Sequence, residues 1–316
     1  MELLAQEAPG SEQVVLSHHS ADLALYSRID PMPNCEDEEI VIPLKRAGKL
    51  LMIECEVDGK KGNFIFDTGA PYLVLNATYF RDYDLRNELY ASGITGGQVA
   101  LMTTRVEKLQ VKNLWYNNVE ADVAELGHIE NARGVKILGL LGLNLFKSFV
   151  IEVDLSKATL KLTRCSKKGE TKDLDPTKYD LVHKLGFLNN TIYVNCEVAG
   201  KRLTYGLDTG AEINVISSFS NKKVLETIKI TGRSSLMGTG SERVEILYGS
   251  MKELYMGELM FENMQTVITQ LEDMGGAYGF AIDGMLGYEL FSRGKVVINI
   301  PKKEMMIRLF DNFRKQ

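Results

Sequence analysis

The sequence predicts a mainly β protein made of two tandem β-barrel lobes related by pseudo-twofold symmetry. Two observations predict this fold class. The chain repeats itself over most of its length, and each copy consists of short apolar segments separated by Gly-containing turns. The 316 residues, 45% of them hydrophobic and 25% charged, are ordinary for a globular chain of about two domains.

Two matching blocks establish the duplication. LLMIECEVDGKKGNFIFDTGA at residues 50–70 matches TIYVNCEVAGKRLTYGLDTGA at residues 191–211, a shift of 141 positions. GLLGLNLFKSFVIEVDLSKATLKL from Gly139 matches GMLGYELFSRGKVVINIPKKEMMIRL from Gly284, a shift of 145. The second copy therefore carries about four extra residues between its two blocks.

The repeats divide the chain into four parts. We expect a first lobe over residues 38–165 and a second lobe over residues 179–316. Residues 166–178 between them are polar and contain Gly and Pro, which is typical of a surface linker. Residues 1–37 form an N-terminal extension without a counterpart in the second unit, and a tail, a pro-segment and an added strand are all open for it.

The strands follow from apolar runs and turn residues. Residues 51–57 form an apolar run that ends at Asp58-Gly59, a strong hairpin signal, and Ala199-Gly200 occupies the same place in the second unit. Residues 149–155 and 295–300 alternate in part and predict further strands.

Helices are expected to be few. The segments after the two Gly-rich blocks, residues 143–147 and 288–293, predict one helical turn each. Longer helical candidates lie near residues 78–90 and 218–229.

Charge and composition exclude several partners. The 37 basic and 42 acidic residues give a net charge of −5 without a basic stripe, so we expect no nucleic-acid partner. No apolar run reaches the roughly 18–20 residues that span a bilayer, so we expect no membrane span. The cysteines and histidines lack metal-ligand spacing, so we expect no metal and no cofactor.

The compartment depends on a short N-terminal signal. Residues 3–6, Leu-Leu-Ala-Gln, resemble the end of a signal peptide, although residues 1–9 lack the basic start of one. This favours export, periplasmic or secreted, over a cytoplasmic location. Whether Cys35 and Cys165 pair in such a compartment is left open.

One motif carries the chemistry. Asp67-Thr68-Gly69-Ala70 and Asp208-Thr209-Gly210-Ala211 each follow an apolar strand, and each precedes a hydrophobic-hydrophobic-Gly element by about 75 residues. These elements are Leu140-Leu141-Gly142 and Met285-Leu286-Gly287. A carboxylate at the end of a buried strand is costly unless it is paired or used, and here it occurs twice.

On these motifs the sequence resembles the aspartic peptidases, of the pepsin and retropepsin clan. Asp-Thr-Gly-Ala is the retropepsin-like form of their motif, and the arrangement is similar to that of bacterial aspartyl proteases with two lobes in one chain. The resemblance implies an aspartic-type endopeptidase in which Asp67 and Asp208 meet between the lobes and activate a water molecule. Ala70 and Ala211 stand where pepsin-like enzymes have Ser or Thr.

The resemblance also implies roles for the neighbouring residues. The hydroxyls of Thr68 and Thr209 would bond across to the opposite loop and hold both carboxylates. Gly69 and Gly210 would let the two loops approach each other closely. Because alanine offers no hydroxyl to the carboxylate, we expect a pH optimum milder than that of pepsin.

A mobile cover over the substrate is expected in each lobe. The candidates are the Gly-rich turns between the two landmarks, since glycines suit a hinged lid. The candidate flap residues are Gly93, Ile94, Thr95, Gly96, Leu236, Met237, Gly238 and Thr239.

The expected partner is a polypeptide substrate bound by a monomer. A peptide-binding module or scaffold that keeps the fold without proteolysis is the main alternative. A third interpretation pairs the first unit of one molecule with the second unit of another, which requires a dimer.

Overall fold

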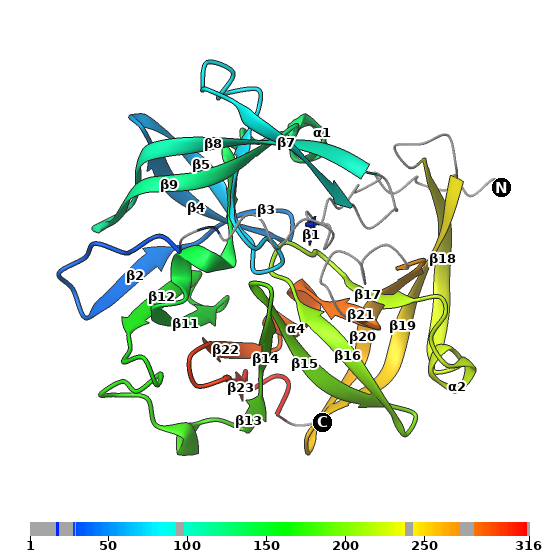
Figure 1. The fold of residues 1–316 in the computed structure, drawn as a ribbon. Coiled ribbons are helices and arrows are strands. Elements are labelled where there is room, and N and C mark those ends of the chain that lie inside the picture. The colour runs from blue at the N-terminus through cyan, green and yellow to red at the C-terminus, as the bar shows by residue number, and fades with distance from the viewer. Residues whose placement is uncertain are drawn as a thin grey trace.

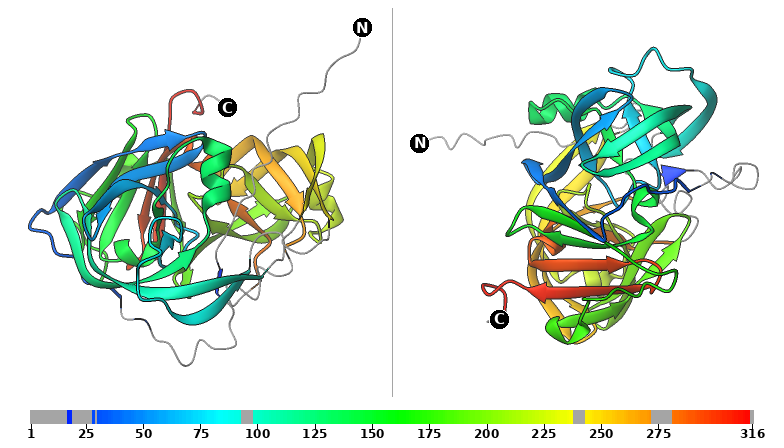
Figure 2. Two further views of the ribbon diagram at one scale, coloured as in Figure 1. Left: turned by 90° about the horizontal axis from the view of Figure 1, so that it is seen from above. Right: turned by 90° about the vertical axis from the view of Figure 1, so that its left-hand side faces the viewer.

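Two six-stranded barrels and a third sheet shared between them make up the fold (Figures 1 and 2). The structure is a computed structural model that describes residues 17–18, 28, 30–92, 98–237, 243–271 and 281–314. For residues 17–18, 87–92, 98–101, 235–237 and 243–245 it describes the path of the main chain only. The described chain is mainly β, as the sequence predicts.

The first barrel closes in the order β4–β5–β10–β6–β9–β8, with β8 returning to pair with β4. Strands β3, β7 and β1 extend this sheet beyond the closed ring. Its strands are β1 (Ser17–His18), β3 (Lys45–Ala47), β4 (Leu50–Val57), β5 (Lys60–Phe66), β6 (Leu73–Asn76), β7 (Arg86–Ser92), β8 (Gln98–Val111), β9 (Leu114–Ala124) and β10 (Gly139–Leu141).

The second barrel repeats this order, with β15–β16–β21–β17–β20–β19 and a closing pair between β15 and β19. Strands β14 and β18 correspond to β3 and β7, whereas β1 has no described counterpart. Its strands are β14 (Gly186–Leu188), β15 (Thr191–Val198), β16 (Lys201–Leu207), β17 (Asn214–Ser217), β18 (Ile228–Met237), β19 (Arg243–Met256), β20 (Leu259–Thr269) and β21 (Gly284–Leu286).

The third sheet joins the two halves of the chain. Its order is β13–β23–β22–β11–β12–β2, and the central pair β11–β22 is antiparallel, with Ile151 opposite Ile298. The strands are β2 (Glu39–Pro43), β11 (Phe149–Asp154), β12 (Thr159–Arg164), β13 (Leu181–Lys184), β22 (Gly294–Asn299) and β23 (Glu304–Leu309). Because equivalent strands stand at equal distances from this central pair, the pseudo-twofold axis passes between β11 and β22.

Helices are short in the described part of the chain. The two turns expected after the Gly-rich blocks are confirmed as η1 (Leu143–Phe146) and α4 (Tyr288–Phe291). A further one-turn 3-10 helix, η2 (Pro176–Lys178), lies in the segment expected to be the linker. A helix that the sequence did not predict, α1 (Gly127–Arg133), follows β9.

The two longer helical candidates are wrong. Residues 78–90 form turns that lead into β7, and residues 218–229 contain only the one-turn α2 (Lys222–Leu225) before β18 begins. In the first segment Phe80 is fully buried and meets Tyr83 edge-on at 5.3 Å between ring centroids. Tertiary packing of these aromatic side chains therefore overrides local helix propensity.

The predicted hairpins are confirmed. Asp58 and Gly59 have φ values of 47° and 82°, and Ala199 and Gly200 have 50° and 70°. Positive φ at both central residues gives the turn that joins two antiparallel strands with the right twist. These turns place β5 and β16 in register beside β4 and β15, so that each strand delivers its C-terminal end to the centre of the molecule.

Candidate active site

The two Asp-Thr-Gly loops begin where β5 and β16 end, and both aspartates are buried. The Asp67 backbone N–H donates to Leu141 O at 3.1 Å, and that of Asp208 donates to Leu286 O at 3.0 Å. Asp67 is 7% exposed and Asp208 is 2% exposed. The parallel pairs β5–β10 and β16–β21 thus fix the start of each loop against the second landmark of its own repeat.

The second landmark passes directly behind each loop. A Cβ on Gly142 would lie 2.0 Å from Tyr72 O, and a Cβ on Gly287 would lie 2.2 Å from Ala211 O. Neither position has room for a side chain, because backbone atoms cannot give way cheaply. The glycine of each hydrophobic-hydrophobic-Gly element is therefore required by close approach to the loop.

The two loops are tied together by the threonines. The Thr68 hydroxyl donates to Leu207 O at 2.8 Å, and the Thr209 hydroxyl donates to Phe66 O at 2.7 Å. Each hydroxyl also accepts the backbone N–H of the other threonine at 3.0 Å. All four bonds cross from one lobe to the other and are buried, so they hold the loops in one relative position.

The glycines bring each loop against the opposite carboxyl group. A Cβ on Gly69 would lie 2.6 Å from Asp208 Cγ, and a Cβ on Gly210 would lie 2.7 Å from an Asp67 carboxyl oxygen. Both distances are shorter than any contact that real Cβ atoms make. Only glycine at these positions lets the two aspartates meet.

The carboxyl groups of Asp67 and Asp208 are hydrogen bonded to each other. Burial is the largest influence on both and raises both pKa values. The neighbouring Asp67 charge and the shared hydrogen bond raise the pKa of Asp208 further, well above its ordinary value. The two carboxyl groups therefore share one proton, which the hydrogen bond between them requires.

Backbone donors favour the charged form of Asp67. Its Oδ1 accepts the N–H groups of Gly69 at 2.8 Å and Ala70 at 3.0 Å, which offset part of the effect of burial on its pKa. The backbone N–H groups of Gly210, at 2.7 Å, and Ala211 act on the pKa of Asp208 in the same direction. The pair thus has a protonated member and an ionised member, which is what general acid–base chemistry on a bridging water requires.

The two alanines lie behind the carboxyl groups and are 1% exposed. Ala70 packs in a cluster with Val74 and Leu140, and Ala211 packs in a cluster with Val215 and Met285. Neither alanine side chain offers a hydrogen-bond donor to its aspartate.

Sequence analysis missed a polar contact between the lobes, which links the end of the Asp208 loop to the first lobe. Glu212, directly after Ala211, accepts bonds from the Arg133 guanidinium and, at 3.3 Å, from the Lys49 N–H. Lys49 also pairs with Glu289 of α4 at 2.8 Å. A signal existed, because Glu212 follows the repeated motif where the first unit has a proline.

Six of the eight candidate flap residues cannot be placed. Gly93, Ile94, Thr95, Gly96, Gly238 and Thr239 lie outside the described residues. Leu236 and Met237 belong to β18, where the main chain pairs with Val244 and Arg243 of β19. Strands β7 and β8, and likewise β18 and β19, form long antiparallel pairs on either side of the undescribed residues 93–97 and 238–242.

Three further features of the described residues concern metal binding, disulfides and membrane-spanning helices. Within the described residues no group of three or more His, Cys, Asp or Glu side chains is arranged to hold a metal ion. All four cysteines are described, and each is a free thiol, including Cys35 and Cys165. None of the described helices is long and apolar enough to cross a membrane.

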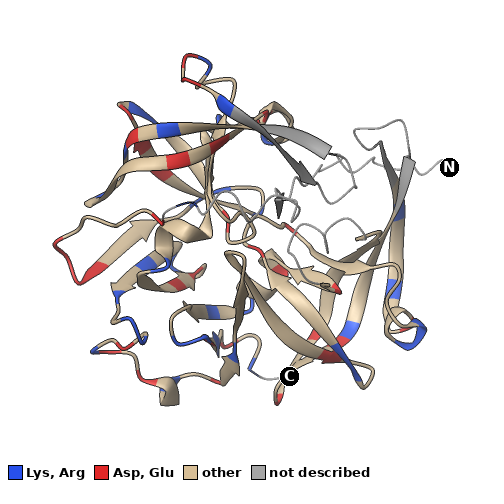
Figure 3. Cartoon of the chain, in the orientation of Figure 1, with Lys and Arg blue, Asp and Glu red and all other residues tan. Residues whose placement is uncertain are grey.

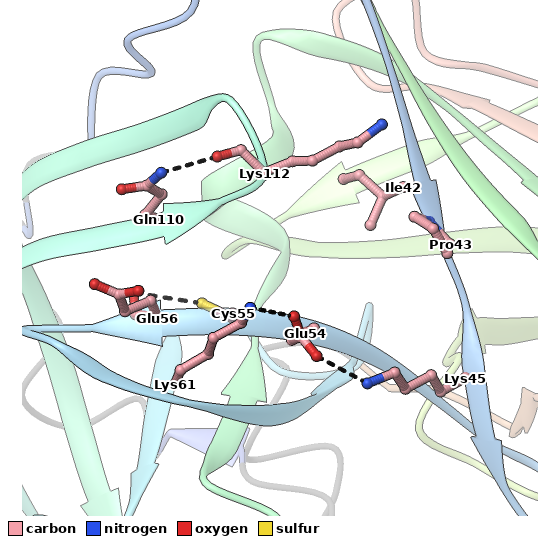
Figure 4. Close-up of a pocket in the computed structure, with 9 residues that line it drawn as sticks. All are labelled: Ile42, Pro43, Lys45, Glu54, Cys55, Glu56, Lys61, Gln110 and Lys112. Atoms are coloured by element: carbon pink, nitrogen blue, oxygen red, sulfur yellow. Dashed lines mark hydrogen bonds and ion pairs between the residues drawn. The ribbon is translucent and has the colours of Figure 1, made fainter.

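A pocket of about 390 Å³ lies on the outer side of the first barrel (Figure 4). Glu54 on its wall accepts from Lys45 at 3.0 Å and pairs with Lys61 at 2.7 Å, and these two lysines lower the pKa of its carboxyl group. The pocket includes no residue of either Asp-Thr-Gly loop. Its lining consists of Ile42, Pro43, Lys45, Glu54, Cys55, Glu56, Lys61, Gln110 and Lys112.

Comparison with known proteins agrees with this geometry. The family model described as aspartyl protease matches the chain twice, over residues 53–145 and residues 194–290. Each match contains one Asp-Thr-Gly loop and its second landmark, and together they cover more than half of the chain. No curated protein gives a significant match. The chain therefore belongs to the aspartyl protease family, with two retropepsin-like lobes.

Proposed function

We propose that the protein is an aspartic endopeptidase that hydrolyses peptide bonds with a water molecule activated between Asp67 and Asp208. The observation that carries this proposal is the buried, hydrogen-bonded pair of carboxyl groups, one from each lobe. Burial and mutual repulsion keep one proton on the pair, so an acid and a base stand side by side. The behaviour of such pairs in aspartic proteases is an established example of this principle.

The proposed reaction uses the two carboxyl groups in turn. Ionised Asp67 takes a proton from the bridging water, and the resulting hydroxide attacks the carbonyl carbon of the scissile bond. Protonated Asp208 donates to the developing oxyanion. When the carbon–nitrogen bond breaks, a proton passes to the leaving amine, and the pair returns to its singly protonated state.

The supporting residues would act through position. Thr68, Thr209, Gly69 and Gly210 hold the two carboxyl groups together, while Ala70 and Ala211 leave them without an added hydroxyl donor. Gly93, Ile94, Thr95, Gly96, Leu236, Met237, Gly238 and Thr239 are proposed to cover the substrate.

A single chain supplies both aspartates, which supports a monomer with a polypeptide substrate. We propose lobes at residues 38–165 and 179–316, a linker at residues 166–178 and an extension at residues 1–37. Acidic and basic residues are interspersed over the described ribbon of both lobes (Figure 3), and this mixture gives no support to a nucleic-acid partner. Sedimentation under assay conditions would show a monomer, whereas an obligate dimer would support pairing between two chains.

The test is cleavage of a diverse peptide mixture between pH 3 and pH 8, read by mass spectrometry. Wild type should cut, and Asp67→Asn should not. Asp154→Asn is the matched control, because Asp154 is buried in β11 away from the loops. A folded wild type that cuts nothing at any pH, with or without residues 1–37, would favour the peptide-binding module instead.

A further inference from the structure

A buried ion pair links the N-terminal extension to the first barrel. Arg28 Nη2 lies 2.6 Å from Asp122 Oδ1, and the two side chains are 9% and 2% exposed. The Arg28 guanidinium also stands over the ring of Tyr72, 4.3 Å from its centroid. An arginine from outside the duplicated unit thus fills a site made of one carboxylate and one aromatic face.

This site lies beside the Asp67 loop, at the boundary between the lobes. Tyr72 follows Asp67 by five residues, and its backbone lies against Gly142 of the second landmark. The Tyr72 hydroxyl is hydrogen bonded to the Asn190 side chain of the second lobe. A side chain bound over Tyr72 is therefore close in sequence to the Asp67 loop and beside a residue of the second lobe.

The extension also touches the hairpin that leads to the first candidate flap. Strand β1 pairs with β7, with Ser17 opposite Ser92 and His18 opposite Ala91. Figures 1 and 2 show β1 between the two lobes. The extension thus contacts two separate parts of the first lobe, β7 at residues 17–18 and Tyr72 at Arg28.

The barrel itself does not need a carboxylate at this position. Asp122 of β9 stands opposite Val74 of β6, and the equivalent pair in the second lobe is Val267 opposite Val215. Val267 is 7% exposed, so the same place in an equivalent barrel is packed with an apolar side chain. The acidic residue is a feature of the first lobe alone.

The surroundings favour a cation. Burial opposes the charge of Arg28, but the fields of Asp122 and, more weakly, Glu120 outweigh it and raise the pKa of the guanidinium. The aromatic face of Tyr72 adds a cation–π contact. The equivalent of Tyr72 in the second lobe is Ile213, so both equivalent positions of the second lobe carry apolar residues.

We propose that Asp122 and Tyr72 form a subsite for an arginine or lysine side chain of the polypeptide substrate, which Arg28 occupies in this structure as a stand-in. The inference rests on the endopeptidase function proposed above. It assigns the substrate class as polypeptides with a basic residue at one fixed place relative to the scissile bond.

The experiment compares kcat/KM for peptides that differ only in Arg or Ala at that place, after the cut sites of a mixture have located it. In wild type, kcat/KM for the Arg peptide should be about tenfold higher than for the Ala peptide; this quotient is the Arg/Ala ratio. Arg28→Ala frees the subsite and should raise the ratio through a lower KM for the Arg peptide. The double variant Arg28→Ala/Asp122→Val copies the second lobe and should bring the ratio to about one.

Two controls separate specificity from structure. Lys161→Ala removes a pair outside the extension, the 3.1 Å contact with Glu39, and should leave the ratio at its wild-type value. Should Arg28→Ala alone fail to fold, the double variant replaces both partners and still reports the ratio. Identical ratios in wild type and double variant would overturn the subsite and leave a purely structural ion pair.

A binding measurement distinguishes failure of the subsite from failure of the proposed function. The probe is a fluorescein-labelled peptide of residues 24–34, compared with the same peptide carrying Ala for Arg28, by fluorescence anisotropy. The full-length Arg28→Ala protein should bind the Arg peptide about tenfold more tightly than the Ala peptide. The double variant should bind the two peptides equally. If wild type cuts nothing, peptide hydrolysis is contradicted, while equal binding of both peptides to Arg28→Ala contradicts the subsite.

Discussion

Thr68 and Thr209 exchange hydrogen bonds across the two lobes, each hydroxyl accepting the other's backbone N–H at 3.0 Å. Each hydroxyl at the same time donates to a carbonyl of the opposite lobe. The arrangement satisfies donor and acceptor on both sides and excludes solvent. The relative position of the two aspartates is thereby set by groups that take no part in proton transfer.

Replacement of Thr68 by valine should destabilise the protein by about 1–3 kcal/mol, because two buried backbone groups of the second lobe lose their partners. Thr68→Ser keeps the hydroxyl and should stay within about 1 kcal/mol of wild type. Chemical denaturation measures both. Equal stability of the valine and serine variants would show that the crossed bonds contribute nothing.

A single methyl group at Gly69 should separate the carboxyl groups of Asp67 and Asp208. Gly69→Ala places a Cβ 2.6 Å from Asp208 Cγ, so the loops must move apart, and kcat/KM should fall by at least about 100-fold. Gly127→Ala, at a position where a Cβ would meet nothing within 4 Å, is the matched control and should retain full activity. Full activity of Gly69→Ala would mean that the carboxyl groups need not touch.

An added hydroxyl beside Asp67 should move the acid limb of the rate profile. The Ala70 N–H already donates to Asp67, and Ala70→Ser adds a donor that favours the charged carboxylate and lowers its pKa. The acid limb of kcat/KM should move to lower pH by about one unit. Ala124→Ser, in the same apolar cluster, should leave the limb in place; a shift toward higher pH in Ala70→Ser would contradict the account.

Protonation of Asp208 links stability to pH. Because burial and the adjacent Asp67 raise its folded pKa above the ordinary 3.8, its contribution to stability is complete below about pH 3.8 and declines as pH rises through the folded value. Asp208→Asn cannot ionise and avoids this decline, which approaches about 1.4 kcal/mol per pH unit.

Thermal unfolding at a series of pH values checks this relation. The melting temperature of Asp208→Asn relative to wild type should increase from acid to neutral pH. Asp82→Asn changes an exposed carboxylate and should follow wild type throughout. A constant difference between Asp208→Asn and wild type would indicate that the folded pKa of Asp208 is ordinary.

The sequence predicts the barrels and the position of the two loops because both depend on repeated, local signals. The repeat locates Asp67 and Asp208, and the Asp58-Gly59 turn fixes the strand that leads to the first of them. The partners of β11 and β22 could not be predicted in this way. Their pairing joins segments about 150 residues apart, and strand periodicity does not say which edge each strand will meet.

Contacts of residues that are not repeated in the other unit could not be predicted from the sequence, for a related reason. Arg28 and Asp122 belong to no motif, and nothing in their neighbours shows that each will find a partner on a distant segment. Glu212 differs from its counterpart Pro71 in the first unit, but this difference does not name its partner. The segment 78–90 fails differently, since burial of Phe80 and the pairing of β7 with β8 outweigh its helical composition. Local sequence signals thus locate the two aspartates, while long-range contacts determine which residues lie around them.

The central claim is that Asp67 and Asp208 act as one unit across the two lobes. The most direct test measures kcat/KM for Asp67→Asn, Asp208→Asn and the double variant on one peptide substrate. Each single substitution should reduce kcat/KM by at least about 1,000-fold, and the double variant should lose no more than either. Losses that multiply in the double variant, or a single variant that still cuts at the wild-type rate, would contradict a shared catalytic pair.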